Sequence, residues 1–153
     1  MPSGPFSESY AEAREKFLTA ARGAGARLWA YEHPEPGPDG AVLATDCAWI
    51  GPADAGQVLV MVSGTHGIEG FCGSGAQIDW LARGEAAQLR PGQAVLLVHG
   101  LNPYGFAWAR RVTNENVDLN RNFVDFAAPL PTNDEYDKLA AAAKPADWSP
   151  ESQ

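Results

Sequence analysis

Residues 57–70 read QVLVMVSGTHGIEG and carry both the main fold signal and the first chemical signal of the chain. Gln57–Val62 is an apolar run after its first residue, and Ala94–Val98 is a second such run. Uninterrupted apolar runs are typical of strands covered on both faces of a parallel sheet. The helical pattern of Ser74–Arg83 lies between them and predicts a βαβ unit with a right-handed crossover. We therefore expect an α/β fold with a mostly parallel or mixed sheet sandwiched by helices.

Segments on either side add further elements to this unit. Capping-box spacing between Ser9 and Glu12, followed by apolar residues at helical intervals, marks the start of a helix. A loop rich in proline and glycine follows at 33–40. The remaining elements are predicted as a helix over 8–22, strands at Ala26–Tyr31 and Val42–Ile50, and a helix over Asn133–Ala143. At this length, residues 1–153 are interpreted as a single domain.

The charge balance restricts the partners. The chain has 11 Lys and Arg against 19 Asp and Glu, a net charge of −8, and its one adjacent basic pair is Arg110-Arg111. Binding to nucleic acid or to an anionic membrane needs clustered cations. The apolar runs are too short to span a bilayer, and acidic residues stand where a signal peptide would be apolar. We therefore expect a soluble, cytoplasmic protein that has no nucleic-acid or membrane partner. Cys47 and Cys72 form no disulfide framework and are interpreted as reduced packing residues.

Two polar, glycine-bearing segments follow the two clearest strands, at 63–70 and 99–105. Because the carboxyl ends of parallel strands meet at one edge of a sheet, both segments should line the same site. His66 and Glu69 lie three residues apart in a glycine-flanked turn and can direct an imidazole and a carboxylate at one point, as a zinc half-site requires. The alternative is that both side chains merely cap the following helix.

The later segments NPYGFAWARR (102–111) and NENVDLNRNF (114–123) add a second and a third motif. Together with HGIE at 66–69, they resemble the zinc carboxypeptidases of the carboxypeptidase A type, over about residues 57–123. Within that superfamily the pattern is most similar to a bacterial branch of uncharacterised carboxypeptidase-like hydrolases. It is more distantly similar to succinylglutamate desuccinylase and aspartoacylase. The resemblance implies a carboxypeptidase-like α/β fold.

The resemblance also implies a role for each matching position. His66 and Glu69 match the first two zinc ligands, so Zn²⁺ is the expected cofactor. Arg111 matches the arginine that stabilises the oxyanion, and Asn120 and Arg121 match the pair that holds a substrate carboxylate. A forked guanidinium suits a planar carboxylate, and a cation beside the metal stabilises negative charge on an attacked carbonyl oxygen.

The implied function is a zinc-dependent hydrolase that cleaves a peptide or amide bond next to a free carboxylate. Its substrate would be a peptide or an N-acyl amino acid. The family's third ligand, a histidine, and its general-base glutamate come later than this chain reaches, and neither His33 nor His99 occupies the third ligand's place. Bulky core residues are also sparse, and no final strand completes the sheet. We therefore expect this chain to be the N-terminal portion of a catalytic domain that is incomplete at the C-terminus. Its partner would be the missing C-terminal half of the domain, and without that half we expect the chain to be inactive.

Several alternatives stay open. One alternative is an N-acyl amino acid deacylase of the aspartoacylase or desuccinylase type, and another is a non-catalytic remnant. Arg110 competes with Arg111 for the oxyanion role through a one-residue slip. A cysteine or serine hydrolase could use Cys72 or Ser74, although the nucleophile-elbow pattern fails because Cys72 stands where its first glycine is required. A nucleotide-binding module lacks its glycine-rich and lysine signatures.

Overall fold

The computed structural model describes residues 4–143. The chain divides into two compact units, Met1–Asn122 and Phe123–Gln153. The described part of the second unit contains the helix α4, Asp134–Ala143, close to its predicted position. The predicted absence of a final strand beyond it falls at 144–153, outside the described residues.

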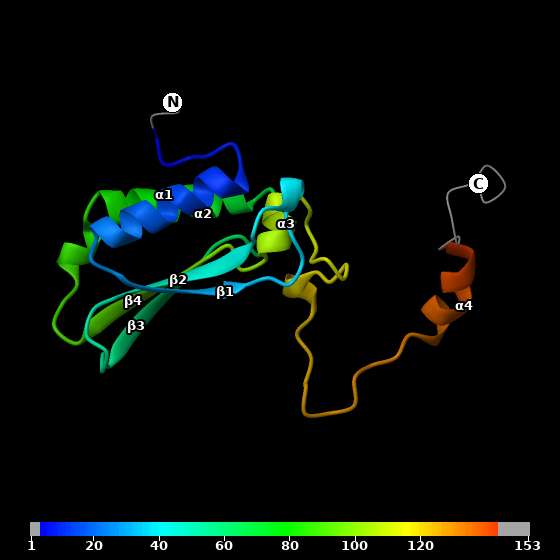
Figure 1. Ribbon diagram of the computed structural model, residues 1–153. Coiled ribbons are helices and arrows are strands. Elements are labelled where there is room, and N and C mark those ends of the chain that lie inside the picture. The colour runs from blue at the N-terminus through cyan, green and yellow to red at the C-terminus, as the bar shows by residue number, and fades with distance from the viewer. Residues whose placement is uncertain (1–3, 144–153) are drawn as a thin grey trace. The chain divides into compact units, whose positions relative to one another are not determined.

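The first unit is built around a mixed sheet of four strands in the order β1-β2-β4-β3 (Figure 1). The strands are β1 (Arg27–Glu32), β2 (Ala44–Ile50), β3 (Gln57–Val62) and β4 (Gln93–His99). β1 pairs antiparallel with β2, and β2 pairs antiparallel with β4. β3 and β4 are parallel and joined through a helix, so the predicted βαβ unit and the α/β class with a mixed sheet are confirmed.

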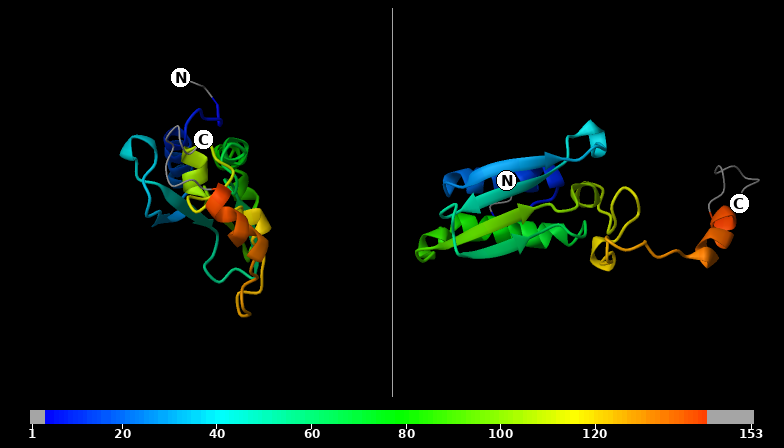
Figure 2. Two further views of the ribbon diagram at one scale, coloured as in Figure 1. Left: turned by 90° about the vertical axis from the view of Figure 1, so that its right-hand side faces the viewer. Right: turned by 90° about the horizontal axis from the view of Figure 1, so that it is seen from below.

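Two helices, α1 (Tyr10–Gly23) and α2 (Gly70–Ala82), lie side by side on the same side of this sheet (Figures 1 and 2). Phe17 of α1 and Ile78 of α2 share one buried cluster with Val95 and Leu97 of β4. Alternate residues of a strand face the same side, so one face of β4 supplies the sheet's share of this core. Within 4–122, the core therefore lies between this helix pair and one face of the sheet.

The expectation that both apolar strands are covered on both faces is wrong for β3. Val58, Leu59, Val60 and Val62 are between 43% and 57% exposed. β3 is an edge strand. Val58, Val60 and Val62 lie on the face opposite α1 and α2. Leu59 pairs with the core residue Val95 and so lies on the helix side, where its place on the edge strand leaves it exposed. Its apolar sequence is that of a covered strand, but within residues 4–122 both long helices lie on one face of the sheet.

Local differences occur where glycine or proline was interpreted as loop. α2 begins at Gly70, four residues before the predicted start. A short helix, α3 (Pro103–Ala107), interrupts the segment predicted to be irregular. Its start is encoded locally, because the Asn102 side chain accepts a hydrogen bond from the Gly105 N–H at 2.8 Å and Pro103 stands at the first helical position.

Among the described helices, none combines the length and the apolar character that a bilayer-spanning helix needs.

Candidate functional site

The segments that follow β3 and β4 meet at one edge of the sheet, as predicted. The Leu101 N–H donates to the Ser63 carbonyl and the Asn102 N–H to the Gly64 carbonyl, each at 2.9 Å. Gly64 has φ +71°, and a Cβ there would lie 2.8 Å from the Gly100 Cα. A glycine is needed at this crossing because the two backbones approach too closely for a side chain. The crossing places the 66–69 turn just beyond the end of β3.

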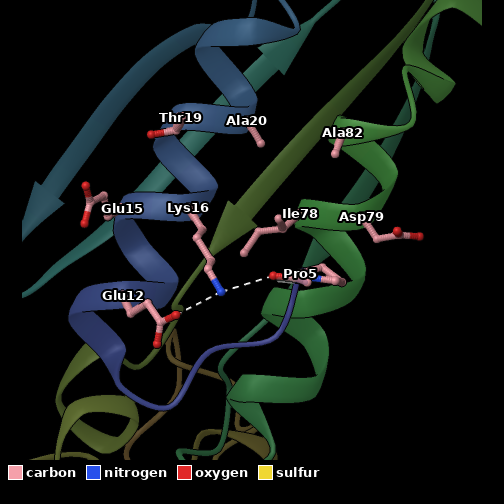
Figure 3. Close-up of a pocket in the computed structure, with 10 residues that line it drawn as sticks. Pro5, Glu12, Glu15, Lys16, Thr19, Ala20, Ile78, Asp79 and Ala82 are labelled. Atoms are coloured by element: carbon pink, nitrogen blue, oxygen red, sulfur yellow. Dashed lines mark hydrogen bonds and ion pairs between the residues drawn. The ribbon is translucent and has the colours of Figure 1, made fainter. Parts of the chain in front are cut away.

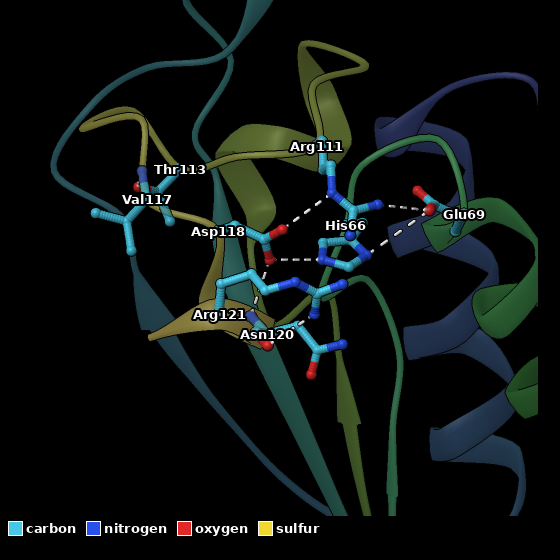
Figure 4. Close-up of polar contacts among 8 residues, drawn as sticks. All are labelled: His66, Glu69, Arg111, Thr113, Val117, Asp118, Asn120 and Arg121. Carbon is cyan, nitrogen blue, oxygen red and sulfur yellow. Dashed lines mark hydrogen bonds and ion pairs between the residues drawn. The ribbon is translucent and has the colours of Figure 1, made fainter. Parts of the chain in front are cut away.

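His66 is held by a carboxylate from a distant loop (Figure 4). Its Nε2 donates to Asp118 Oδ1 at 2.8 Å, and its side chain is 12% exposed. Its Nδ1 faces Glu69 Oε1 at 3.7 Å, which is too long for a hydrogen bond. The Glu69 side chain is 62% exposed. One ring nitrogen is thus anchored, and the other faces an accessible carboxylate.

Arg111 bridges the two carboxylates of this cluster. Its Nε donates to Asp118 Oδ2 at 3.0 Å, and its Nη1 lies 3.4 Å from Glu69 Oε1. The neighbouring Arg110 points elsewhere, since its Nη2 donates to Asn116 Oδ1 and its guanidinium lies 6.0 Å from the centre of the Tyr104 ring. The fold therefore brings the guanidinium of Arg111, and not that of Arg110, to the His66–Glu69 turn.

Asp118 is the site residue that the sequence analysis missed. The hydrogen bond from His66 lowers the pKa of its carboxyl to about 2, aided by the Asn120 N–H and the Arg111 guanidinium. Asp118 therefore stays ionised at neutral pH and can hold the imidazole. A signal was present in the sequence, because a metal-binding histidine needs an acceptor for its second nitrogen and Asp118 stands inside the third motif.

Asn120 and Arg121 lie next to Asp118 on a short 3-10 turn, Leu119–Arg121. The Asn120 N–H donates to Asp118 Oδ1 at 2.9 Å, and Arg121 Nη1 donates to the Asn120 carbonyl at 3.0 Å. Both residues are exposed. The pair is tied to the cluster through the backbone, and its guanidinium stays accessible to a ligand.

These residues fit part of a zinc site. Two ligands bound to one tetrahedral zinc at about 2.0 to 2.2 Å lie roughly 3.4 Å apart, close to the 3.7 Å between His66 Nδ1 and Glu69 Oε1. Asp118 supplies the outer acceptor that such a histidine requires. Within residues 4–143, however, no three His, Cys, Asp or Glu side chains are grouped so that they could hold a metal ion. The described residues therefore fit a zinc site in two ligands, His66 and Glu69, and in the outer acceptor Asp118.

The two rival nucleophiles, Ser74 and Cys72, lie in different surroundings. Ser74 bonds to His99 at 2.8 Å, but both are fully buried, with His99 stacked on Phe17 at 4.4 Å between ring centres. Burial lowers the pKa of His99 to about 3, so its imidazole is neutral. Cys72 is exposed rather than packed, whereas Cys47 is buried, and both are free thiols. His99 is therefore a packing residue, and it takes no part in the cluster of His66, Glu69, Arg111 and Asp118.

A pocket of about 600 Å³ opens between α1 and α2, away from this site (Figure 3). Its floor includes Ile78 and Ala20, and Lys16 crosses it. The Lys16 ammonium bonds to Glu12 at 2.9 Å and to the Gly4 carbonyl at 3.1 Å. None of the predicted site residues lines it.

Comparison with known proteins gives one family and several distant structural likenesses. The family model described as "Protein of unknown function (DUF2817)" matches residues 6–153. No curated protein matches the chain. The glutaminyl cyclase of Porphyromonas gingivalis is similar with a TM-score of 0.45 and 17% identity, over 67% of this chain and 41% of that one. A Zn-dependent exopeptidase from Parabacteroides distasonis is similar with a TM-score of 0.43 and 12% identity, over 81% of this chain and 46% of that one. The chain thus spans less than half the length of either structure.

Proposed function

The chain belongs to the family of proteins of unknown function DUF2817, and from its site we propose that it supplies the N-terminal part of a zinc-dependent hydrolase centre. The bond cleaved would be a peptide or amide bond next to a free carboxylate. One observation carries the proposal: Asp118 holds His66 through Nε2 while Nδ1 faces the accessible Glu69 carboxylate. This is the arrangement in which proteins prepare a histidine for a metal.

Each residue of the cluster has a part in this proposal. His66 and Glu69 would hold the zinc, and Asp118 would keep the imidazole in the tautomer that leaves Nδ1 unprotonated. Zinc bound there would supply Lewis-acid polarisation of a carbonyl and a bound water of lowered pKa. Arg111 would meet the negative charge that develops on the attacked carbonyl oxygen.

Substrate orientation would come from Asn120 and Arg121. Their exposed side chains suit the free carboxylate of a peptide or an N-acyl amino acid, because a planar guanidinium can bind a carboxylate through two parallel hydrogen bonds. This carboxylate is present in both the substrate and the transition state, so the pair would contribute binding more than rate.

The third zinc ligand and the general base have no counterpart in the described site. A catalytic zinc site needs three protein ligands and an open position, so we expect the chain by itself to bind zinc without turning over substrate. The remaining ligand and the base would come from a further part of the domain, which is the partner that this half-site requires.

The test is zinc binding by the purified chain, measured by isothermal titration calorimetry in a weakly coordinating buffer. We expect one site, which His66→Ala abolishes. Asp118→Asn should weaken zinc binding by about 10- to 100-fold, because the imidazole loses its charged acceptor. His33→Ala is the matched control, since His33 bonds locally to the Glu35 backbone and should leave the affinity unchanged.

Two results would contradict the proposal. One is stoichiometric zinc binding that survives His66→Ala, which would place the metal elsewhere. The other is an absence of zinc binding by a wild-type chain whose circular dichroism shows that it is folded.

A further inference from the structure

The loop between α3 and Asp118 contains a backbone conformation that its sequence does not favour. Ala109 has φ +51° and is exposed. Left-handed backbone is disfavoured for alanine because its Cβ approaches a carbonyl oxygen, whereas glycine and asparagine adopt it readily. Because the Ala109 side chain is exposed, its packing does not account for the left-handed conformation. The reason for the conformation must lie in what the adjacent backbone does.

The turn at Ala109 directs the main chain of Arg110 onto the candidate metal site. The Arg110 N–H donates to the Gly105 carbonyl at 2.8 Å, and the Arg110 carbonyl accepts from the Gly67 N–H at 2.9 Å. Gly67 lies inside the His66–Glu69 turn. These two main-chain hydrogen bonds therefore tie the His66–Glu69 turn to α3 through Arg110.

The fit at this contact leaves no room for a side chain. A Cβ added to Gly67 would overlap the carbonyl oxygens of both Gly105 and Arg110. Contact this close makes the position of the turn depend on the position of the Arg110 carbonyl. A change of backbone direction at Ala109 would thus be felt directly at His66 and Glu69.

The same reversal decides which arginine faces the cluster. With Ala109 left-handed, the Arg111 side chain reaches Glu69 and Asp118, and the Arg110 side chain turns away toward Asn116. Both effects follow from the backbone direction at Ala109. The carbonyl of Arg110 fixes the turn, and the guanidinium of Arg111 fixes the two carboxylates.

We propose that the left-handed turn at Ala109 is a positioning element of this site: it sets the His66–Glu69 turn through the Gly67–Arg110 hydrogen bond and selects Arg111 as the cation of the cluster. Ala109 touches none of the reacting groups and acts through its neighbours. The part of the proposal that concerns zinc rests on the proposed function. The part that concerns the backbone and the His66 ring does not depend on a metal.

The test compares Ala109→Val with Ala109→Gly and Ala109→Asn. A β-branched residue does not adopt the left-handed conformation, whereas glycine and asparagine do, and the exposed position makes the substitution affect backbone direction alone. Ala41→Val is the matched control, because Ala41 is exposed with φ −62° and ψ 139°, an extended conformation that valine favours.

Three readouts separate the possible outcomes. In Ala109→Val, the Gly67 amide should exchange with solvent at least about tenfold faster, while the Val95 amide of the core strand keeps its protection. The ¹⁵N shifts of the His66 ring should change in the metal-free chain, because Arg111 leaves Asp118. Zinc affinity should fall by about tenfold or more. The glycine, asparagine and Ala41→Val chains should match the wild type in all three.

Unchanged Gly67 exchange or unchanged His66 shifts in Ala109→Val would overturn the proposal. Equal loss of protection at Gly67 and Val95 would also overturn it, since Ala109 would then act on global stability alone. If Ala109→Val altered the Gly67 exchange but left the zinc affinity unchanged, the result would contradict the part of the proposal that concerns zinc. Failure of the wild-type chain to bind zinc would instead contradict the proposed function, and the first two readouts would still decide the role of Ala109.

Discussion

His99 is a buried imidazole that makes folding depend on pH. Burial lowers its pKa to about 3 from the ordinary value of 6.5, so the folded chain keeps it neutral while the unfolded chain binds a proton below about pH 6.5. The unfolded state therefore holds more protons between these two values. Stability is greatest above pH 6.5 and is lost as the pH falls toward 3, by about 1.4 kcal/mol per pH unit.

Urea unfolding at pH 6.5, 5.5 and 4.5 checks this dependence. The wild-type chain should lose free energy of unfolding across this window, whereas His99→Gln, which keeps an amide able to bond to Ser74, should lose much less. The window lies above both the ordinary pKa of 3.8 for the Asp118 carboxyl and its lowered pKa of about 2, so that group contributes little to the slope. Identical slopes for the two chains would show that His99 is not the titrating group.

Arg121 provides a second residue-level prediction. The exposed guanidinium should bind a small carboxylate, so N-acetylglycine should shift the NMR signals of the 118–122 segment. Arg121→Ala should weaken this binding several-fold, and added salt should weaken it in the wild type. The exposed Arg90 lies elsewhere in the sequence, and Arg90→Ala should have no effect. Equal effects of the two substitutions would mean that any surface arginine suffices.

The individual residues of the candidate site were readable from the sequence to different degrees. His66, Glu69 and Arg111 were chosen from motif and spacing, and the fold brings His66 Nδ1 and Arg111 Nη1 to 3.7 Å and 3.4 Å from Glu69 Oε1. Asp118 was not chosen, because its role depends on a contact with His66 across 52 positions. Ala109 could not have been found, since a left-handed alanine carries no sequence signal.

At the level of elements, two serines near the start of α1 should differ in their contribution to stability. The Ser9 hydroxyl accepts from the Glu12 N–H at 3.2 Å, and Ser9→Ala should lower the free energy of unfolding by about 1 kcal/mol. The buried Ser7 hydroxyl has no hydrogen-bond partner among the described residues, so Ser7→Ala should be neutral or stabilising. Thermal unfolding of both chains checks the contrast, which equal destabilisation would contradict.

The elements themselves followed from periodicity, whereas some of their limits did not. β3 was predicted at its observed bounds because a short apolar run that follows a glycine is typical of a buried strand. The start of α2 was placed too late because Gly70 was assigned to the glycine-flanked turn of His66 and Glu69. Packing decides otherwise: a Cβ on Gly70 would lie 3.1 Å from the Phe106 ring, so glycine is there for close approach inside a helix.

At the level of the whole molecule, α1 and α2 both lie on one face of the sheet and leave the other face without a long helix within residues 4–122. The register places Val60 beside Leu96, and Leu96 beside Trp49, on the face opposite the helices. The sequence predicted these residues to be apolar and covered, and only the tertiary arrangement reveals which face has no helix. A sequence pattern reports the environment that a strand suits, and the neighbouring elements determine whether that environment is present.

Within residues 4–122, this face without a long helix and the edge of β3 that pairs with no strand predict that the chain associates with itself. β3 contains no charged residue and no proline, so it lacks the features that protect edge strands from pairing. Val60→Lys places a charge on the 52% exposed position at the strand centre and should reduce association strongly, whereas Val42→Lys, at a 61% exposed position outside the sheet, should not. Sedimentation equilibrium over a hundredfold range of concentration, roughly 1 to 100 μM, measures both in a range where edge pairing is expected. A wild-type chain that stays monomeric throughout would contradict the prediction, and equal effects of the two lysines would assign the association to net charge instead of the β3 edge.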